Sequence, residues 1–168
     1  VMEAVLSKAL SKKIRLDDGR TPEGGSNRSK VFRFKTVSSA SGVPETVIVK
    51  CVNPSETEPY VPGKPGGPAG QLFDEWASLQ LLTEVSGDEP IAPRFYGGDR
   101  SEGFILMEDI GQGDSLVQPL LGDNPVAAEE ALKMYFAAIG KLHALTIGKE
   151  GDYRRIRGNL GPQAHEPS

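Results

Sequence analysis

The sequence predicts an α+β fold built on a five-stranded antiparallel sheet. Two near-continuous apolar runs, residues 46–52 and 104–107, predict buried strands, because a strand that is covered on both faces needs no polar alternation. Between them, residues 71–85 carry apolar side chains at helical spacing. Together these observations indicate a sheet with a helix packed against it.

Three weaker strands complete the predicted sheet. Residues 14–16 form a short strand, turn residues fill 17–29, and 31–37 resume as the second strand of a hairpin. Residues 92–98 form a further short strand before the run at 104–107. A short helix over 2–10 precedes the sheet, since its apolar residues recur every three or four positions.

The composition fits one folded domain. The 168 residues have a net charge of −4 and are 38% hydrophobic, which suffices for a single core. Mild acidity without a basic stripe argues against nucleic acid as a partner. No run approaches the roughly 20 apolar residues of a membrane span, and no charged-then-apolar leader stands at the start, so we expect a cytoplasmic protein. The single cysteine, Cys51, lies in a strand run and is expected to be an inert core residue.

The turn region 17–29 contains a glycine-rich stretch that includes Gly25, Ser26 and Asn27. It is close to the phosphate-binding pattern GxxxxGK[ST], but Gly25 stands in the lysine position and a strand follows where a helix is required. That motif is therefore rejected. Two interpretations stay open: an ordinary hairpin turn, or a glycine hairpin whose main-chain N–H groups face phosphate oxygens.

Lys50 interrupts the apolar run 46–52 and has Ile48 and Val52 as neighbours on its face of the strand. An unpaired ammonium there would be costly, so Lys50 needs an anionic partner. The alternative is a lysine at a strand end that reaches out to water.

Glu75 is the natural partner for this lysine. It follows Leu72 by three residues and precedes Leu79 by four, which places it on the apolar stripe of the helix 71–85. The alternative is a partly solvated acid at the edge of the stripe. Residues 53–70 are rich in proline and glycine and predict an exposed excursion between strand and helix.

The strand 104–107 passes without a turn signal into the crossing segment, residues 108–111, where Glu108 and Asp109 end the apolar run. A short helix over 115–121 and a long one over 125–147 follow. The long helix shows a core-facing pattern that would also hold His143 as a hydrogen-bonded core residue: Leu132, Tyr135, Phe136, Ile139 and Leu142. Residues 149–168 form a polar tail without periodicity, which we expect to be truncated or disordered.

A strand lysine, a helix acid and a hinge strand recur together in kinases. The motifs EGGSNRSKVFRF, VIVK, FDEWASLQLL, APRFYGGDRSEGFILMEDIG and AAIGKLHAL occur here in that order. The sequence thus resembles the aminoglycoside phosphotransferase and choline kinase superfamily, which has the protein-kinase-like fold. The resemblance covers about residues 14–145. It implies a nucleotide-binding N-lobe over 1–110 with a C-helix, then a hinge and the first helices of a C-lobe over 111–148.

The resemblance also implies an ATP site. Lys50 would contact the α- and β-phosphates, and Glu75 would hold it in place. The loop over the phosphates would consist of Gly25, Ser26 and Asn27. The main chain of Glu108 and Ile110 would bind adenine, and Met107 would stand at the back of the adenine pocket.

The chain differs from the family in the residues that carry out catalysis. Such enzymes need a catalytic-loop aspartate, an asparagine and a second aspartate for Mg²⁺ after the long helix. The only candidate histidine, His165, is followed by Glu166 and Pro167, so proline stands in the place of the aspartate. We therefore predict no catalytic or metal-binding residue in this chain, and we expect the Mg²⁺ ligands outside it.

These observations lead to one main expectation and two alternatives. We expect the ATP-binding, N-terminal portion of a small-molecule phosphotransferase, with the hydroxyl acceptor bound mainly by a C-lobe that is missing from this chain. One alternative is a non-catalytic kinase-like module for nucleotide binding or protein interaction. The other is a plain α+β interaction domain in which Lys50 and Glu75 are structural.

Overall fold

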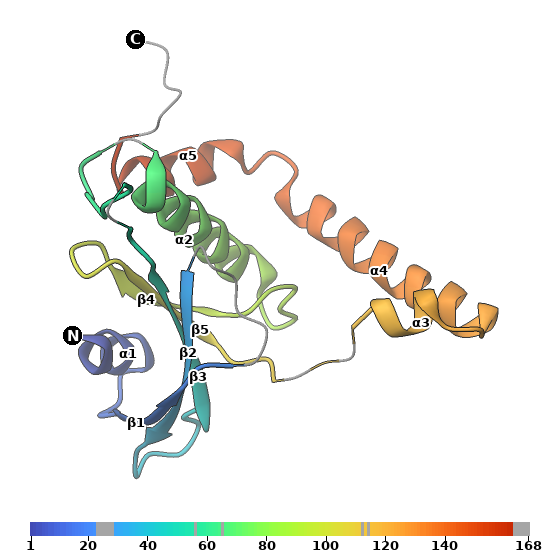
Figure 1. Ribbon diagram of the computed structural model, residues 1–168, viewed down its shortest axis with the longest axis horizontal. Helices are drawn as coiled ribbons and strands as arrows, with labels where there is room; N and C mark the ends of the chain where they lie inside the picture. The colour runs from blue at the N-terminus through green and yellow to red at the C-terminus, as the bar shows by residue number, and fades with distance from the viewer. Residues whose placement is uncertain (23–28, 56, 65, 112, 114, 163–168) are drawn as a thin grey trace.

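The structure is a computed structural model that describes residues 1–22, 29–55, 57–64, 66–111, 113 and 115–162 (Figure 1). The predicted phosphate loop, Gly25 to Asn27, lies outside these residues. The helices and strands in chain order are α1 (Met2–Leu10), β1 (Arg15–Arg20), β2 (Ser29–Val37), β3 (Thr46–Val52), α2 (Gly67–Ser86), β4 (Phe95–Asp99), β5 (Phe104–Glu108), α3 (Val117–Leu121), α4 (Pro125–Thr146) and α5 (Glu150–Gly158).

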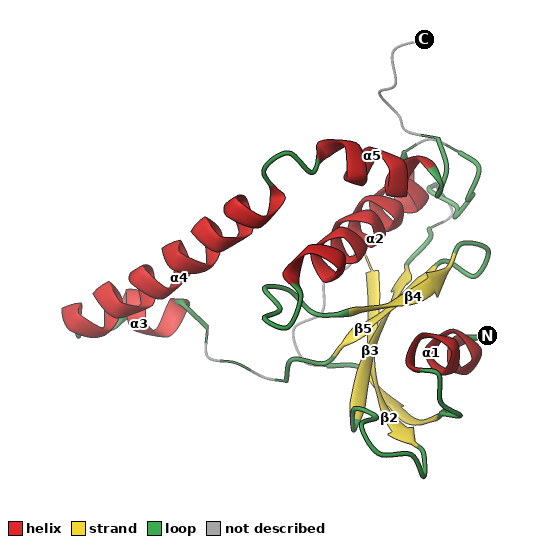
Figure 2. Ribbon diagram, turned by 180° about the vertical axis from the view of Figure 1, so that it is seen from behind, coloured by secondary structure: helices red, strands yellow, loops and turns green. Residues whose placement is uncertain are grey.

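The five strands form one antiparallel sheet in the order β1-β2-β3-β5-β4, which confirms the predicted α+β class and the five-stranded sheet. Helix α1 lies on one side of this sheet and α2 on the other (Figures 1 and 2). The strands β3 and β5 lie in the middle of the sheet, as their apolar runs predict.

Side chains of β3 alternate between the two faces. Val47 and Val49 pack with Leu6 in the cluster beneath α1, whereas Ile48 and Val52 contact the cluster beneath α2. The strand β5 follows the same alternation, with Phe104 and Leu106 on the α1 side and Ile105 and Met107 on the α2 side. Lys50 therefore lies on the face of the sheet that α2 covers.

Helix α2 begins at Gly67, earlier than the predicted start at residue 71, with a proline in its first turn. Its buried residues are Ala69, Gly70, Leu72, Phe73, Ala77 and Leu81. This set is wider than the predicted stripe because a second element, α5, packs on α2 with Ile156 and Leu160.

Two predicted irregular regions have regular structure. The strand β1 continues through Arg20, although residues 17–20 were expected to be a turn; pairing with β2 supplies backbone hydrogen bonds whatever the side chains are. Asp18 has φ +52° at a register shift between Asp17 and Arg20, which indicates a bulge.

The expectation of a polar tail without regular structure is wrong for Glu150–Gly158, which forms α5. Ion pairs at helical spacing, such as Arg154 with Glu150 at 2.7 Å, support the helix. The guanidinium of Arg157 is buried against α2, where its Nε lies 2.6 Å from an oxygen of Asp74. The tertiary contacts of α5 thus replace the apolar periodicity that the sequence lacks.

Helices α3 and α4 lie away from the sheet (Figure 1). Ala131 is the one buried residue of α4, and the predicted core residues Leu132, Tyr135 and Phe136 are exposed. His143 is exposed as well, so its prediction as a core histidine is wrong in this structure. The described helices include none that is long and apolar enough to cross a membrane.

Candidate functional site

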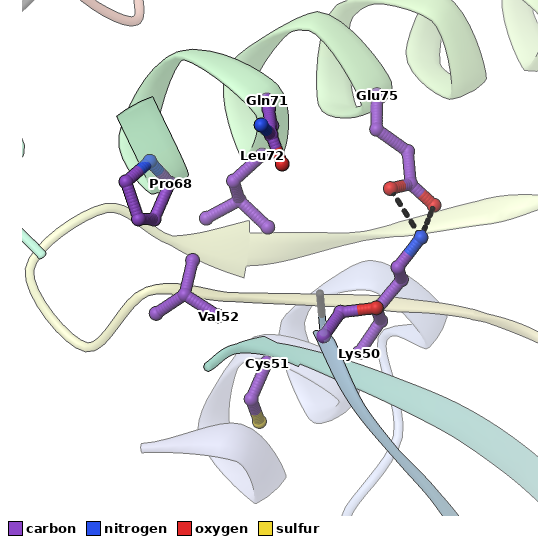
Figure 3. A pocket seen from close by; sticks show the side chains of 8 residues that line it. Lys50, Cys51, Val52, Pro68, Gln71, Leu72 and Glu75 are labelled. Atoms are coloured by element: carbon purple, nitrogen blue, oxygen red, sulfur yellow. Dashed lines mark hydrogen bonds and ion pairs between the residues drawn. The ribbon is translucent and has the colours of Figure 1, made fainter. Parts of the chain in front are cut away.

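Lys50 and Glu75 meet across the gap between β3 and α2 (Figure 3). The Lys50 Nζ donates to both carboxylate oxygens of Glu75, at 2.8 Å to Oε1 and 2.6 Å to Oε2. The two side chains are 28% and 32% exposed. The predicted pairing of a strand lysine with a helix acid is therefore confirmed.

The local folding of each element explains why these side chains meet. Lys50 lies opposite Val31 of β2 and Ile105 of β5, in a row of the sheet that faces α2. Glu75 lies one turn after Leu72, which is buried against the same face. Strand alternation and helical periodicity thus direct both charged groups to one place.

A cleft of about 150 Å³ lies beside this pair. Its lining residues come from β3, from the start of β2 and from the first turns of α2: Ser29, Lys50, Cys51, Val52, Pro68, Gln71, Leu72 and Glu75. Figure 3 shows the amide of Gln71 on the same side as the Lys50 ammonium, and the Cys51 sulfur pointing away from the ion pair. The cleft therefore combines the Lys50–Glu75 ion pair with neutral polar groups.

Two features beside the cleft would favour an anion as its ligand. An ammonium has three N–H donors, and Glu75 is the only partner of Lys50 within the described ranges. The first turn of α2 carries no acidic residue and no side-chain cap, so its partial positive charge is not neutralised there. A phosphate group could bind Lys50 without displacing Glu75.

Cys51 takes no part in this chemistry. Burial raises the pKa of its thiol above the ordinary value, which keeps the sulfur protonated and unreactive at neutral pH. The sequence predicts an inert core residue; the thiol is half-buried, and its raised pKa agrees with an inert sulfur.

The predicted adenine-binding residues lie at and just beyond the C-terminal end of the inner strand β5 and do not line the cleft. Met107 is buried in the core cluster between the sheet and α2. The Glu108 N–H donates to the Arg94 carbonyl at 2.8 Å, and a Glu108 carboxylate oxygen accepts from the Arg94 N–H at 3.1 Å. The Ile110 side chain is exposed, and no described residue accepts a hydrogen bond from its N–H.

The two predicted ends of the site lie along the same stretch of β3. Glu108 lies opposite Val47, and Lys50 follows Val47 by three residues on β3. Three residues of extended strand span about 10 Å.

One charged residue that the sequence analysis did not assign to the site is Asp109. Its carboxylate, only 5% exposed, accepts hydrogen bonds from the Arg33 Nη2 at 2.9 Å, the Thr46 Oγ1 at 2.7 Å and the Gly111 N–H at 2.9 Å. The signal available in the sequence was an acid directly after a buried strand. Its partner Arg33 could be identified only from the register of β2 against β3.

Metal-ligating side chains do not form a cluster among the described residues. Among residues 1–22, 29–55, 57–64, 66–111, 113 and 115–162, no three His, Cys, Asp or Glu side chains gather in a group that could hold a metal ion. Glu75 is engaged with Lys50 instead.

Comparison with known proteins adds no family assignment. No protein-family model matches the chain, and no curated protein matches its sequence. A functional interpretation therefore depends on the order of the motifs and on the geometry of the cleft.

Proposed function

We propose that this chain is the ATP-binding, N-terminal portion of a phosphotransferase that moves the γ-phosphate of ATP to a hydroxyl group of a small molecule. The observation that carries this proposal is the Lys50 ammonium, held by both oxygens of Glu75 beside the cleft. A lysine fixed in this way presents its charge to phosphate oxygens. The expected cytoplasmic location belongs to the same proposal, as does the division into a kinase-like N-lobe and the start of a C-lobe.

The energetics of the ion pair support a binding role over a purely structural one. Both groups are partly exposed, and ion pairs of this kind contribute at most about 1 kcal/mol to stability. Apolar residues at positions 50 and 75 would join the apolar surfaces of Ile48 and Leu72 at no desolvation cost. A charged pair at this position is therefore better explained by the need for a cation at the cleft.

The crossing segment supplies the other half of the proposed site. The Ile110 N–H is available as a donor to a ring nitrogen of adenine, with Met107 behind the base and the Glu108 main chain beside it. Gly25, Ser26 and Asn27 complete the proposal as the loop over the phosphates.

The proposal places the catalytic groups and the acceptor site on a C-lobe outside this chain. Bound with ATP, Mg²⁺ would neutralise phosphate charge, and its ligands would also come from that lobe. The exposed apolar side chains of α4, including Tyr135 and Phe136, support this arrangement, because surface of this kind is normally covered by other protein.

Binding measurements with the 168-residue chain test the proposal. Calorimetry should detect saturable binding of Mg·ATP, and replacing Lys50 with Met should weaken it at least about tenfold, a loss of about 1.4 kcal/mol. Glu75→Gln should weaken binding less, since it releases the ammonium without removing it. The matched control is Lys8→Met, which removes an exposed lysine from α1, on the opposite side of the sheet. Full affinity in the Lys50→Met variant, or no binding by the unaltered chain at millimolar ATP, would overturn the proposal.

A second candidate is a non-catalytic kinase-like module that binds nucleotide or protein. One observation favours it: α4 exposes an apolar surface that suits protein contact. The coding sequence downstream of Ser168 separates the candidates. A histidine–x–aspartate loop followed by a second aspartate favours the enzyme, and phosphotransfer by the longer product would establish it. A stop codon favours the module.

A further inference from the structure

The segment that follows β5 is held in place by the contacts of one side chain, Asp109. Directly after β5, the Asp109 carboxylate binds groups from three places: Arg33 of β2, Thr46 at the start of β3, and the main-chain N–H of Gly111. The Arg33 Nε also lies 2.6 Å from Oδ2, which adds an ion pair to the hydrogen bonds. The crossing segment is thus tied to two strands and to itself.

The sheet register places this cluster on the proposed nucleotide face. Arg33 lies opposite Ile48, which in turn lies opposite Met107. Residues directly across an antiparallel pair share a face, so Arg33 lies on the same face as Ile48. Ile48 is two residues before Lys50 on β3, so Arg33 and Lys50 also share a face. The guanidinium crosses this face to reach Asp109.

The carboxylate is stable as an anion in this position. Burial raises the pKa of Asp109, but the hydrogen bonds from Arg33, Thr46 and the Gly111 N–H outweigh burial and hold the pKa below its ordinary value. The contacts of Asp109 with Arg33, Thr46 and Gly111, which tether the crossing segment to the sheet, are therefore intact at neutral pH. Gly111 adopts φ +77°, which a residue with a Cβ rarely accepts, so the turn that brings its N–H to Asp109 favours glycine.

The tether fixes the crossing segment at both ends. The Glu108 N–H is held by the Arg94 carbonyl, and Gly111 is held by Asp109. Between these fixed points, the Ile110 N–H has no acceptor in the described part of the chain. A main-chain donor that is held still, with no acceptor among the described residues, is preorganised for a ligand, because binding then costs less conformational freedom.

We propose that Asp109 is a positioning residue for the base of the bound nucleotide: with Arg33 and Thr46 it holds the main chain of residues 108–111 in the shape that binds the edge of adenine. The proposal rests on the proposed function. It separates the site into two independent parts, one at Lys50 for the phosphates and one at Asp109 for the base.

The test compares ATP with tripolyphosphate, which carries the phosphates without the base. Calorimetry on the 168-residue chain with Mg²⁺ gives both dissociation constants. The dissociation constant of tripolyphosphate divided by that of ATP is the ratio that measures the contribution of the base. Asp109→Asn should weaken ATP binding about tenfold, because the segment loses its preorganised shape. Tripolyphosphate binding should not change. A purely structural role would lower the melting temperature without changing this ratio.

Two further variants complete the test. Thr46→Val removes one contact and leaves the Arg33 pair, so it should fold even if Asp109→Asn does not, and should lower the ratio less. Asp99→Asn is the matched control, since this carboxylate also accepts main-chain N–H groups, from Ser101 and Glu102, but at the β4–β5 turn. It should leave the ratio unchanged.

The outcomes distinguish this proposal from the proposed function. If the unaltered chain binds neither ligand, the proposed function fails and the role of Asp109 fails with it. If it binds ATP more tightly than tripolyphosphate and both Asp109→Asn and Thr46→Val keep the same ratio, only the positioning role is overturned. An equal affinity of the unaltered chain for the two ligands also overturns it, because the base then contributes nothing.

Discussion

The central strands and helix α4 both carry apolar patterns that predict burial, but they lie in opposite environments. The side chains at 104–106 in β5 are almost completely buried, between α1 on one face and α2 on the other. Helix α4 also carries apolar side chains at helical spacing, yet Ala131 is its one buried residue. The difference teaches that an apolar pattern shows which face needs to be covered and does not show what covers it.

The largest expected effect contrasts two phenylalanines. Phe73 of α2 is 1% exposed and lies between the guanidinium groups of Arg100 and Arg157, each 5.6 Å from its ring centre, whereas Phe136 of α4 is 63% exposed. Phe73→Ala should lower the free energy of unfolding by about 3–5 kcal/mol through loss of packing. Phe136→Ala should change it by less than about 0.5 kcal/mol. Urea denaturation measures both, and similar losses would show that α4 is covered in solution.

The next effect concerns how α5 is attached. The Arg157 side chain is 2% exposed and binds Asp74 and the Gly161 carbonyl, at 2.6 and 2.9 Å. Arg157→Met keeps most of the apolar stem and removes these charge-assisted hydrogen bonds, which should cost about 1.5–3 kcal/mol. The control Arg154→Met removes an exposed pair with Glu150 and should cost less than about 0.5 kcal/mol. Equal melting temperatures for the two variants would contradict the docking of α5 on α2.

These contacts mark the limit of what the sequence could predict. The bounds of α1 and β3 and the direction of Lys50 follow from local periodicity, and Glu75 lies only 25 residues further along the chain. Arg157 and Asp74 are 83 residues apart, and Arg33 and Asp109 are 76 apart. Their pairing depends on strand register and helix docking, which no local pattern encodes. The helix α5 was missed for the same reason, because tertiary contacts stabilise it.

The start of α2 illustrates a second limit. Glycine and proline dominate residues 66–70 and predict an irregular segment, but the helix already begins at Gly67. Proline is accepted in a first helical turn, where its missing N–H would have no partner, and the burial of Ala69 and Leu72 outweighs the entropic cost of the glycines. Tertiary burial therefore overrides local propensity at the edge of the proposed site.

A smaller effect is expected in acid, at the junction between the two regions. Since the folded-state pKa of Asp109 is lowered, its stabilising contribution is present above the ordinary pKa and is lost as the pH falls through the folded-state value. Stability of the unaltered chain should therefore decline between about pH 5 and pH 2, and Asp109→Asn should show a shallower decline. The difference in free energy of unfolding between the unaltered chain and the Asp109→Asn variant narrows as the pH falls. A constant difference across this range would show that the carboxylate is not held as described.

The smallest effect tests whether α4 unfolds separately from the sheet. The Asn124 side chain caps α4 by accepting hydrogen bonds from the Val126 and Ala127 N–H groups, at 3.1 and 3.3 Å. Asn124→Ala should cost the helix about 1 kcal/mol. Because α4 makes few contacts with the sheet region, this loss should appear as local opening, with amides of the first turns of α4 exchanging about fivefold faster and those of β3 and β5 unchanged.

Asn124→Asp provides the control for this last prediction. It keeps the acceptor oxygen and adds a negative charge at the helix N-terminus, where such a charge is favourable, so exchange in α4 should be unchanged or slower. Faster exchange in β3 and β5 of the Asn124→Ala variant would mean that α4 and the sheet open as one cooperative unit. The exposed face of α4 would then be coupled to the core through contacts such as Lys141 with Glu89, 2.7 Å apart. The central strands and α4 would then differ in burial but not in their opening free energy.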